Sequence, residues 1–267
     1  MPPALAAAGA GHLRWRCRWP RIAGSECASA LHREKRMTTS EPDRSSQPPY
    51  RYPDYVSTRF RAPTRPPLRV PGFSSVHAGP ARDGSALAPL DADLTRNGRR
   101  SGEPVGERII VTGRIIDEAG RPVPGALLEI WQANAAGRYI QPTDQHDAPL
   151  DPNFLGAGRC RSDATGHYGF RTIKPGAYPW QNHPNAWRPN HIHLSLFGPD
   201  FGSRLVTQMY FRGDPLLPLD PIYNSVPEDA RDLLLAQFDL DRTEPGVALA
   251  FRFDVVLNGP GATPHEG

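Results

Sequence analysis

A regular alternation of apolar and polar residues begins near Glu107 and continues in short segments to about residue 257. Ile109, Val111 and Ile115 fall on one face at a period of two residues, which predicts a half-buried strand. Similar segments predict strands at about 126–132, 167–173, 191–197, 204–211 and 248–257. Turn signals and loops, the longest at 133–156, separate these segments. The pattern therefore predicts a mainly β fold.

One segment has the signals of a helix. Residues 225–228, Ser-Val-Pro-Glu, fit a capping box with a proline inside the first turn. The apolar face of this helix would be formed by Leu233, Leu234 and Phe238. Many strands, the turns between them and a single late helix together predict a β-sandwich core.

The first 105 residues lack this periodicity. We expect residues 1–49 to be a disordered extension, residues 50–105 to be an extended arm that wraps a neighbour or its own domain, and residues 106–267 to be the β-sandwich domain. Residues 1–36 hold seven Lys or Arg and two Glu. This segment fits a transit peptide, a disordered extension, or translation upstream of a true start at Met37, which we favour.

Composition excludes several classes of protein. Without residues 1–36 the chain holds 24 basic and 26 acidic residues, so its body has no charge excess that would bind nucleic acid. No apolar run approaches the ~18 residues needed to span a bilayer, so we expect no membrane segment. The 31 prolines are more than twice the usual share of ~5%, which argues for loops and against a mainly helical fold.

The three cysteines have no metal-binding spacing. Cys17 and Cys27 lie in the basic segment, and Cys160 stands alone in the main body. An isolated cysteine without a disulfide partner fits a reducing compartment, so we expect the protein in the cytoplasm.

Candidate chemistry gathers around two histidines. His191 and His193 lie two apart in a predicted strand, where side chains share a face and Cα atoms are about 6.6 Å apart. Two imidazoles so placed can bind one metal, but imidazole suits zinc, copper, iron and nickel alike. An isolated His-x-His pair is more often structural, so this pattern needs further support.

Two tyrosines narrow the choice of metal. Tyr178 lies shortly before the histidines, and Tyr139 lies in the long loop. Ionising a phenol at pH 7 costs about 4 kcal/mol, which a trivalent cation offsets better than a divalent one. Fe(III) with two phenolates and one hydroxide is neutral and tolerates burial. Spacing alone leaves open whether the four side chains meet.

Several ordered motifs resemble those of the intradiol ring-cleaving dioxygenases, over about residue 50 to the C-terminus. The matching segments are 106–111, 131–134, 148–154, 171–176, 178–193, 207–211 and, with lower specificity, 251–254. The resemblance implies that Tyr139, Tyr178, His191 and His193 are the ligands of a non-haem Fe(III) ion.

Within that family, the chain is most similar to the iron-bearing subunit of members that act on protocatechuate. It shows no N-terminal helical domain of the kind carried by relatives that act on catechol or hydroxyquinol. The resemblance implies an oxidoreductase that cleaves protocatechuate with O2 to 3-carboxy-cis,cis-muconate in aromatic degradation by the β-ketoadipate pathway, paired with a homologous alpha subunit. The alternatives are the same chemistry on another catechol, or a non-catalytic sandwich subunit, which would lack the ligand set.

The resemblance also implies roles for residues around the metal. Tyr178 would leave the metal and take a proton, and Arg188 would stabilise negative charge on the substrate ring. Tyr55, Trp180 and Gln208 would contact the substrate. A packing role is the alternative for Trp180 and Gln208.

Overall fold

The computed structural model describes residues 44–65, 86–197 and 204–266. Residues 1–43 of the extension expected at 1–49, including Met37, lie outside the described residues, whereas residues 44–49 belong to the described structure. The described residues belong to one compact unit by their contacts. In the described ranges no helix is both long and apolar enough to cross a membrane.

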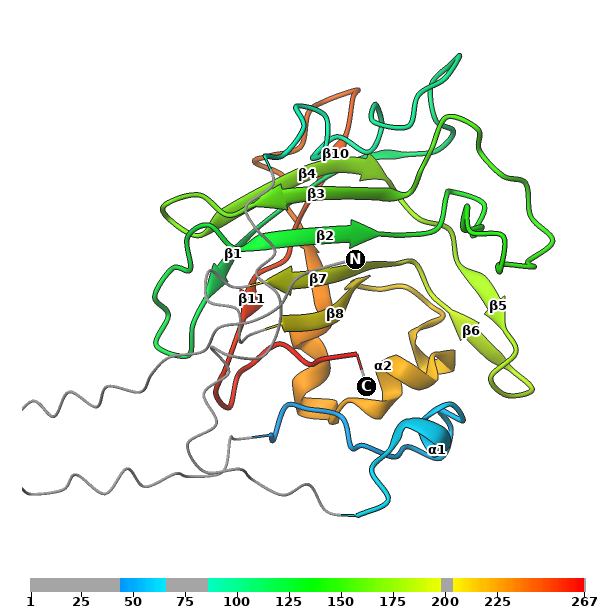
Figure 1. Cartoon of the computed structure of the whole chain (residues 1–267), viewed down its shortest axis with the longest axis vertical. Helices are drawn as coiled ribbons and strands as arrows, with labels where there is room; N and C mark the ends of the chain where they lie inside the picture. The colour runs from blue at the N-terminus through cyan, green and yellow to red at the C-terminus, as the bar shows by residue number, and fades with distance from the viewer. Residues whose placement is uncertain (1–43, 66–85, 198–203, 267) are drawn as a thin grey trace, which may run out of the picture. The chain divides into compact units, whose positions relative to one another are not determined.

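Strands outnumber helices among the regular elements of the described residues (Figure 1). The main strands are β1 (Arg108–Ile116), β2 (Leu127–Trp131), β3 (Ala157–Arg161), β4 (His167–Ile173), β7 (His191–Phe197), β8 (Arg204–Phe211), β9 (Leu235–Phe238), β10 (Leu249–Arg252) and β11 (Val255–Val256). A separate hairpin is formed by β5 (Tyr178–Trp180) and β6 (Ala186–Arg188). The helical elements are short: α1 (Thr58–Arg61), η2 (Leu217–Leu219), α2 (Pro221–Ser225) and η3 (Glu228–Leu234).

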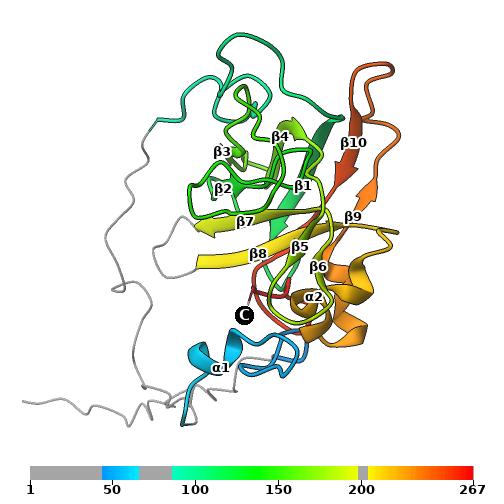
Figure 2. The same cartoon turned by 90° about the vertical axis from the view of Figure 1, so that its right-hand side faces the viewer.

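The nine main strands form one bent sheet. Its order is β11-β1-β10-β9-β8-β7-β2-β3, and β4 pairs with β1. Because β3 and β4 also contact each other, the sheet is nearly closed into a barrel, and Figure 2 shows the two layers that result. The prediction of a mainly β fold is confirmed.

The hydrophobic core fills the space inside this bend. Strand β1 alternates between buried and half-buried residues, as the sequence pattern predicts, and Ile109, Val111 and Ile115 are fully buried. Leu94, in the expected arm, belongs to the same core, and its N–H donates to the Arg171 carbonyl at 2.9 Å. This part of the arm therefore packs on its own domain.

The predicted strands at 167–173, 191–197 and 204–211 are confirmed with the same bounds. The segment 248–257 is divided into β10 and β11, because the chain bends at Phe253 and Asp254. There the Phe253 N–H donates to the Thr112 carbonyl at 2.8 Å, and Asp254 Oδ1 accepts from the Arg114 N–H at 2.9 Å. Strands β3, β5, β6 and β9 are not predicted by the sequence pattern.

The predicted helix after residue 225 is wrong in kind and extent. Residues 228–234 form the 3₁₀ helix η3, and no side chain caps its N-terminus. The Ser225 hydroxyl donates to the Ile222 carbonyl at 2.7 Å instead. The chain then enters the sheet as β9, where Leu235 pairs with Tyr210 of β8, and Phe238 is 54% exposed. Sheet pairing replaces the helix that the local pattern predicts.

Candidate metal centre

Strand β7 positions the two histidines. Alternate residues from Ile192 to Leu196 belong to the core, so His191 and His193 lie on the opposite face. That face is covered too, and both imidazoles are buried. Pairing with β2 places Trp131 opposite His193, where the two rings stack with centroids 4.8 Å apart. The fold therefore holds both rings in defined positions.

Two loops bring the tyrosines to this face. Asn134 Oδ1 accepts two backbone N–H bonds from the residues that follow, at 2.9 and 3.0 Å, which closes a tight turn. Gly137 in that turn has a φ of +80°, and a Cβ there would collide with the Ala177 carbonyl oxygen. Because the turn lies against the residue before β5, Tyr139 and Tyr178 meet edge to face, with ring centroids 5.7 Å apart.

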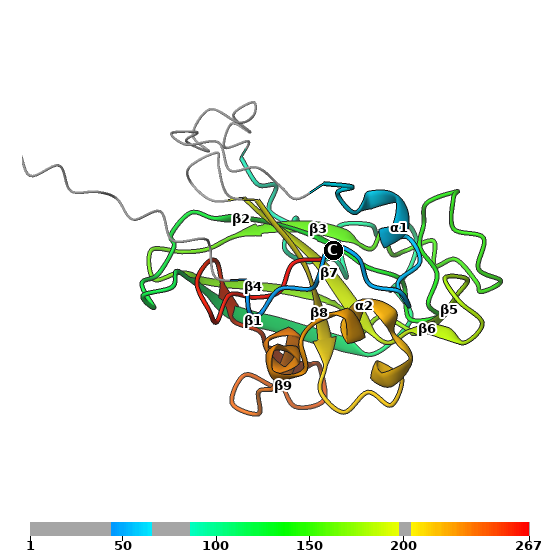
Figure 3. The ribbon, with the colours of Figure 1, turned by 90° about the horizontal axis from the view of Figure 1, so that it is seen from below.

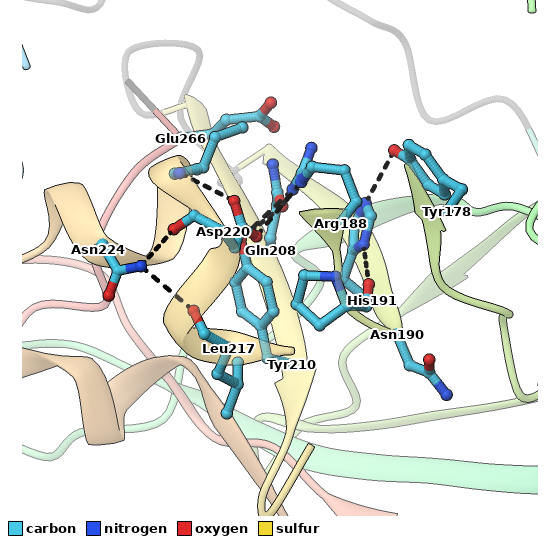
Figure 4. Close-up of polar contacts among 12 residues, drawn as sticks. Tyr178, Arg188, Asn190, His191, Gln208, Tyr210, Leu217, Asp220, Asn224 and Glu266 are labelled. Carbon is cyan, nitrogen blue, oxygen red and sulfur yellow. Dashed lines mark hydrogen bonds and ion pairs between the residues drawn. The ribbon is translucent and has the colours of Figure 1, made fainter. Parts of the chain in front are cut away.

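Four donor atoms converge at this point. The Oη of Tyr139 lies 3.1 Å from Nε2 of His193 and 3.4 Å from Nε2 of His191. The Oη of Tyr178 lies 3.5 Å from the Oη of Tyr139. It also lies 3.5 Å from Nε2 of His191 (Figure 4). The structure thus brings together all four residues predicted as metal ligands.

The second ring nitrogen of each histidine has its own partner. Nδ1 of His191 lies 2.6 Å from the carbonyl oxygen of Pro189, and Nδ1 of His193 lies 3.2 Å from Oε2 of Glu266. Each Nδ1 carries the ring proton and donates a hydrogen bond to that oxygen, so each Nε2 keeps a free lone pair that can bind a metal. Burial, with Arg188 nearby, holds the pKa of His191 well below its ordinary value, and the imidazole stays neutral. Both features suit a metal ligand.

The two phenols differ in their surroundings. Burial raises the pKa of Tyr139 well above its ordinary value, and the adjacent Tyr178 phenol adds to this effect. Burial also raises the pKa of Tyr178, but the positive charge of Arg188 opposes that shift more strongly than any other neighbour does. Tyr178 is therefore the phenol whose anion Arg188 favours more directly.

Arg188 lies at the centre of a buried polar network (Figure 4). Its Nε lies 3.2 Å from Oδ2 of the fully buried Asp220, and its Nη2 donates to Oε1 of Gln208. The hydroxyl of Tyr210 donates to the same Oε1 at 2.8 Å. Burial alone would lower the pKa of Arg188, but the Asp220 carboxylate holds it well above its ordinary value. The site therefore contains a fixed positive charge.

Comparisons with known proteins identify the family. Residues 78–259 match the family model described as Dioxygenase, and residues 41–72 match the model described as protocatechuate 3,4-dioxygenase beta subunit N terminal. The chain belongs to the intradiol dioxygenase family. It is an oxidoreductase by this membership, and the family uses non-haem iron.

The curated relatives of this intradiol dioxygenase differ in how much of their length they share with it. The protocatechuate 3,4-dioxygenase beta chain of Burkholderia cepacia is 62% identical over 84% of this chain and 95% of its own. The alpha chain from the same organism is 30% identical over 59% of this chain and 76% of its own. A catechol 1,2-dioxygenase of Candida albicans is 35% identical over 45% of this chain and 42% of its own.

Solved structures of related enzymes also align. The 3-chlorocatechol 1,2-dioxygenase of Rhodococcus opacus 1CP is 26% identical to this chain and has a TM-score of 0.48. The alignment covers 67% of this chain and 69% of that one.

The donor set of this dioxygenase fits iron. Ligands at about 2.0–2.1 Å from one ion are themselves roughly 3 Å apart, and the contacts among the donor atoms here are 3.1 to 3.5 Å. In the described ranges no group of three or more His, Cys, Asp or Glu side chains is arranged to hold a metal. A trivalent ion would supply the positive charge that two buried phenolates require.

The other predicted residues also lie near this centre. Tyr55 is 5% exposed and meets Trp180 edge to face, with centroids 5.5 Å apart. The Arg188 guanidinium lies 5.2 Å from the centre of the Trp180 ring. Arg61 lies over the other aromatic ring, 4.8 Å from the Tyr55 centroid. Tyr55 and Trp180 thus form one aromatic wall with a cation at each side.

Four residues at the site escape sequence reasoning: Asp220, Tyr210, Trp131 and Glu266. Asp220 has a local signal, because an Asp followed by Pro marks a helix start, and its Oδ1 accepts the Ile222 N–H at 2.8 Å. Glu266 has no such signal, since only the folded chain brings its carboxylate next to Nδ1 of His193.

Proposed function

We propose that this chain is the iron-bearing subunit of an enzyme that cleaves protocatechuate with O2 to give 3-carboxy-cis,cis-muconate. The convergence of two phenol oxygens and two imidazole nitrogens carries the proposal, because this donor set suits a non-haem Fe(III) ion. Both atoms of O2 enter the product, and the substrate supplies the electrons, so no nicotinamide or flavin is needed.

Tyr139, Tyr178, His191 and His193 would hold the iron. A ferric ion there would bind both hydroxyl oxygens of a catechol and activate the electron-rich ring toward O2. The histidines suit permanent ligands, because each has its Nδ1 proton engaged and its ring buried. Tyr139 is likewise fixed by its turn, through an N–H bond to Asp144 Oδ2 at 2.7 Å.

Tyr178 is the residue we assign to proton transfer. Its phenolate oxygen would accept a proton from a substrate hydroxyl, and Arg188 is the neighbour that most favours the anion before transfer. The hairpin register places the two residues directly opposite each other across β5 and β6. After transfer the neutral phenol would leave Arg188 to stabilise negative charge on the bound ring.

The aromatic wall supports an acidic catechol as substrate. Tyr55 and Trp180 meet edge to face, and Arg61 and Arg188 lie over their rings, so positive charge gathers at this wall. A ring carboxylate would gain from that charge, whereas unsubstituted catechol would not. The 62% identity to a protein named for protocatechuate supports the same choice. Gln208, bonded to Arg188, would act on substrate through that arginine.

We further propose that the enzyme is an αβ assembly in the cytoplasm. A relative that this chain covers over 95% of its length is named a beta chain, and two relatives named alpha chains also match this chain. Cys160 is free and buried, which agrees with a reducing compartment.

Oxygen uptake on a panel of catechols tests this function. The purified chain, co-expressed with its alpha homologue, should consume one O2 per protocatechuate and form the 3-carboxymuconate, with much lower kcat/KM on catechol and hydroxyquinol. Faster turnover of either alternative substrate would overturn the choice of protocatechuate. No uptake on any catechol by iron-loaded protein would overturn the activity.

A further inference from the structure

The oxygens that accept hydrogen bonds from Nδ1 of the two histidines come from very different places in the sequence. The Pro189 carbonyl that accepts from His191 is only two residues away, just before β7. The carboxylate that faces His193 comes from Glu266, 73 residues further along the chain. Its position depends on how that distant segment is fixed.

The segment 262–266 is fixed along β8. The Glu266 N–H donates to the Val206 carbonyl at 2.7 Å. The hydroxyl of Thr207, which is fully buried, donates to the Pro264 carbonyl at 2.7 Å. Hydrogen bonds to two consecutive residues of β8 therefore fix where the Glu266 side chain lies relative to His193.

A second segment from the start of the described chain covers the first. The His265 N–H donates to Oε1 of Gln47 at 2.9 Å, and Nε2 of Gln47 lies within 3.5 Å of the carbonyls of Ala262 and Thr263. Figures 1 and 3 show these segments side by side beneath β7 and β8. The Gln47 side chain thus contacts backbone groups both at residues 262–263 and at His265, directly before Glu266.

We propose that Glu266 is the positioning residue for His193 and that Gln47 holds it there, so that residues 44–47 contribute to iron retention. This inference rests on the proposed function, since it concerns the same iron ligands. Neither Gln47 nor Glu266 lies among the four donors; each acts through His193.

The physical reason lies in the imidazole tautomer. Nε2 of His193 can bind a metal only while the proton stays on Nδ1, and an acceptor at Nδ1 both selects that tautomer and stops ring rotation. The stacked Trp131 restrains the ring plane, but a ring face cannot select the nitrogen that carries the proton. Loss of such an outer partner usually weakens metal binding by about 10–100-fold.

The rate of iron release into a chelator tests this role. Full-length chain, co-expressed with its alpha homologue, is compared as wild type, Glu266→Ala, Glu266→Gln and the exposed control Glu118→Gln, by following loss of visible absorption. We expect Glu266→Ala to weaken iron binding by about 10–100-fold, and so to release iron into the chelator correspondingly faster than wild type. Glu266→Gln should be intermediate, because its amide oxygen can still accept the Nδ1 proton.

Gln47→Ala provides an independent second variant, with the exposed Gln237→Ala as its matched control. Gln47→Ala should release iron faster than wild type, and less severely than Glu266→Ala, while thermal melting of the iron-free forms stays similar. Wild-type release by both Glu266→Ala and Gln47→Ala would overturn the inference and leave the iron assignment intact. A folded wild type that binds no iron would overturn the proposed function, and this inference with it.

Discussion

At the scale of single residues, Arg188 has two roles: it stabilises the fold, and it places positive charge at the site. Its pair with Asp220 is buried, so removal of one partner leaves an uncompensated charge and costs about 3–5 kcal/mol. Arg188→Ala should therefore lower the melting temperature as well as kcat. A change in activity from this variant alone would not separate the two roles.

The double variant Arg188→Gln with Asp220→Asn separates them. It removes both charges, and Asn still caps α2, so most of the lost stability should return. If Arg188 stabilises developing charge, kcat should stay about 10²–10³ below wild type with iron bound. Melting curves and steady-state rates on the same preparations provide the measurement. Recovery of kcat along with stability would show that the arginine is only structural.

Cys160 offers a test of the packed core. Burial raises the pKa of its thiol to about 12, so at pH 8 almost no reactive thiolate is present. In the native protein, iodoacetamide at pH 8 should leave Cys160 unmodified, while modification should be complete after unfolding in guanidinium. Mass spectrometry of the peptide that contains residue 160 reports both states. Rapid labelling of Cys160 in the folded protein would contradict the burial described here.

The sequence could predict the donor residues better than their supports. A period of two, which is a local property of a strand, places His191 and His193 on one face, and the family motifs name them with Tyr139 and Tyr178. Glu266 and Tyr210 act on the site through contacts that only the folded sheet creates, so no short-range pattern predicts them.

At the scale of elements, the turn at Gly137 decides whether the tyrosines meet. Gly137→Ala adds a Cβ that collides with the Ala177 carbonyl, at a φ that already disfavours other residues. We expect loss of most bound iron, measured by metal analysis, because Tyr139 would move away from Tyr178.

Gly120→Ala is the matched control for this prediction. Gly120 has a φ of +75°, but nothing lies within 4 Å of its Cβ position. It should cost about 1–2 kcal/mol of stability and leave iron content unchanged. Equal iron content in the two variants would show that the close approach of the turn to β5 is unimportant for the metal.

Elements with a long, regular alternation could be predicted from sequence, and short ones could not. Strands β4 and β8 have seven and eight residues, and their bounds agree with the pattern. The hairpin strands β5 and β6 have three residues each, too few for a period to be recognised. After residue 225 a capping box is present, but pairing of β9 with β8 and β10 determines the conformation.

At the scale of the whole molecule, exposed apolar side chains bear on assembly. Val105, Ile140, Leu150 and Leu155 are between 39% and 72% exposed in and near the loop that carries Tyr139. Contact with an alpha homologue would bury such residues. We expect the chain expressed alone to be poorly soluble or poorly active, and co-expression to restore both. Gel filtration with activity assays measures this. Full activity on protocatechuate from a homo-oligomer would refute the αβ proposal.

Metal analysis combined with visible absorption tests the central claim most directly. Chain co-expressed with its alpha homologue in iron-supplied medium should contain about one iron per chain and be reddish, because phenolate-to-Fe(III) charge transfer absorbs visible light. His191→Ala and His193→Ala should each remove both iron and colour while the protein remains folded. A folded, colourless wild type that carries zinc, or histidine variants that keep iron and colour, would contradict the account.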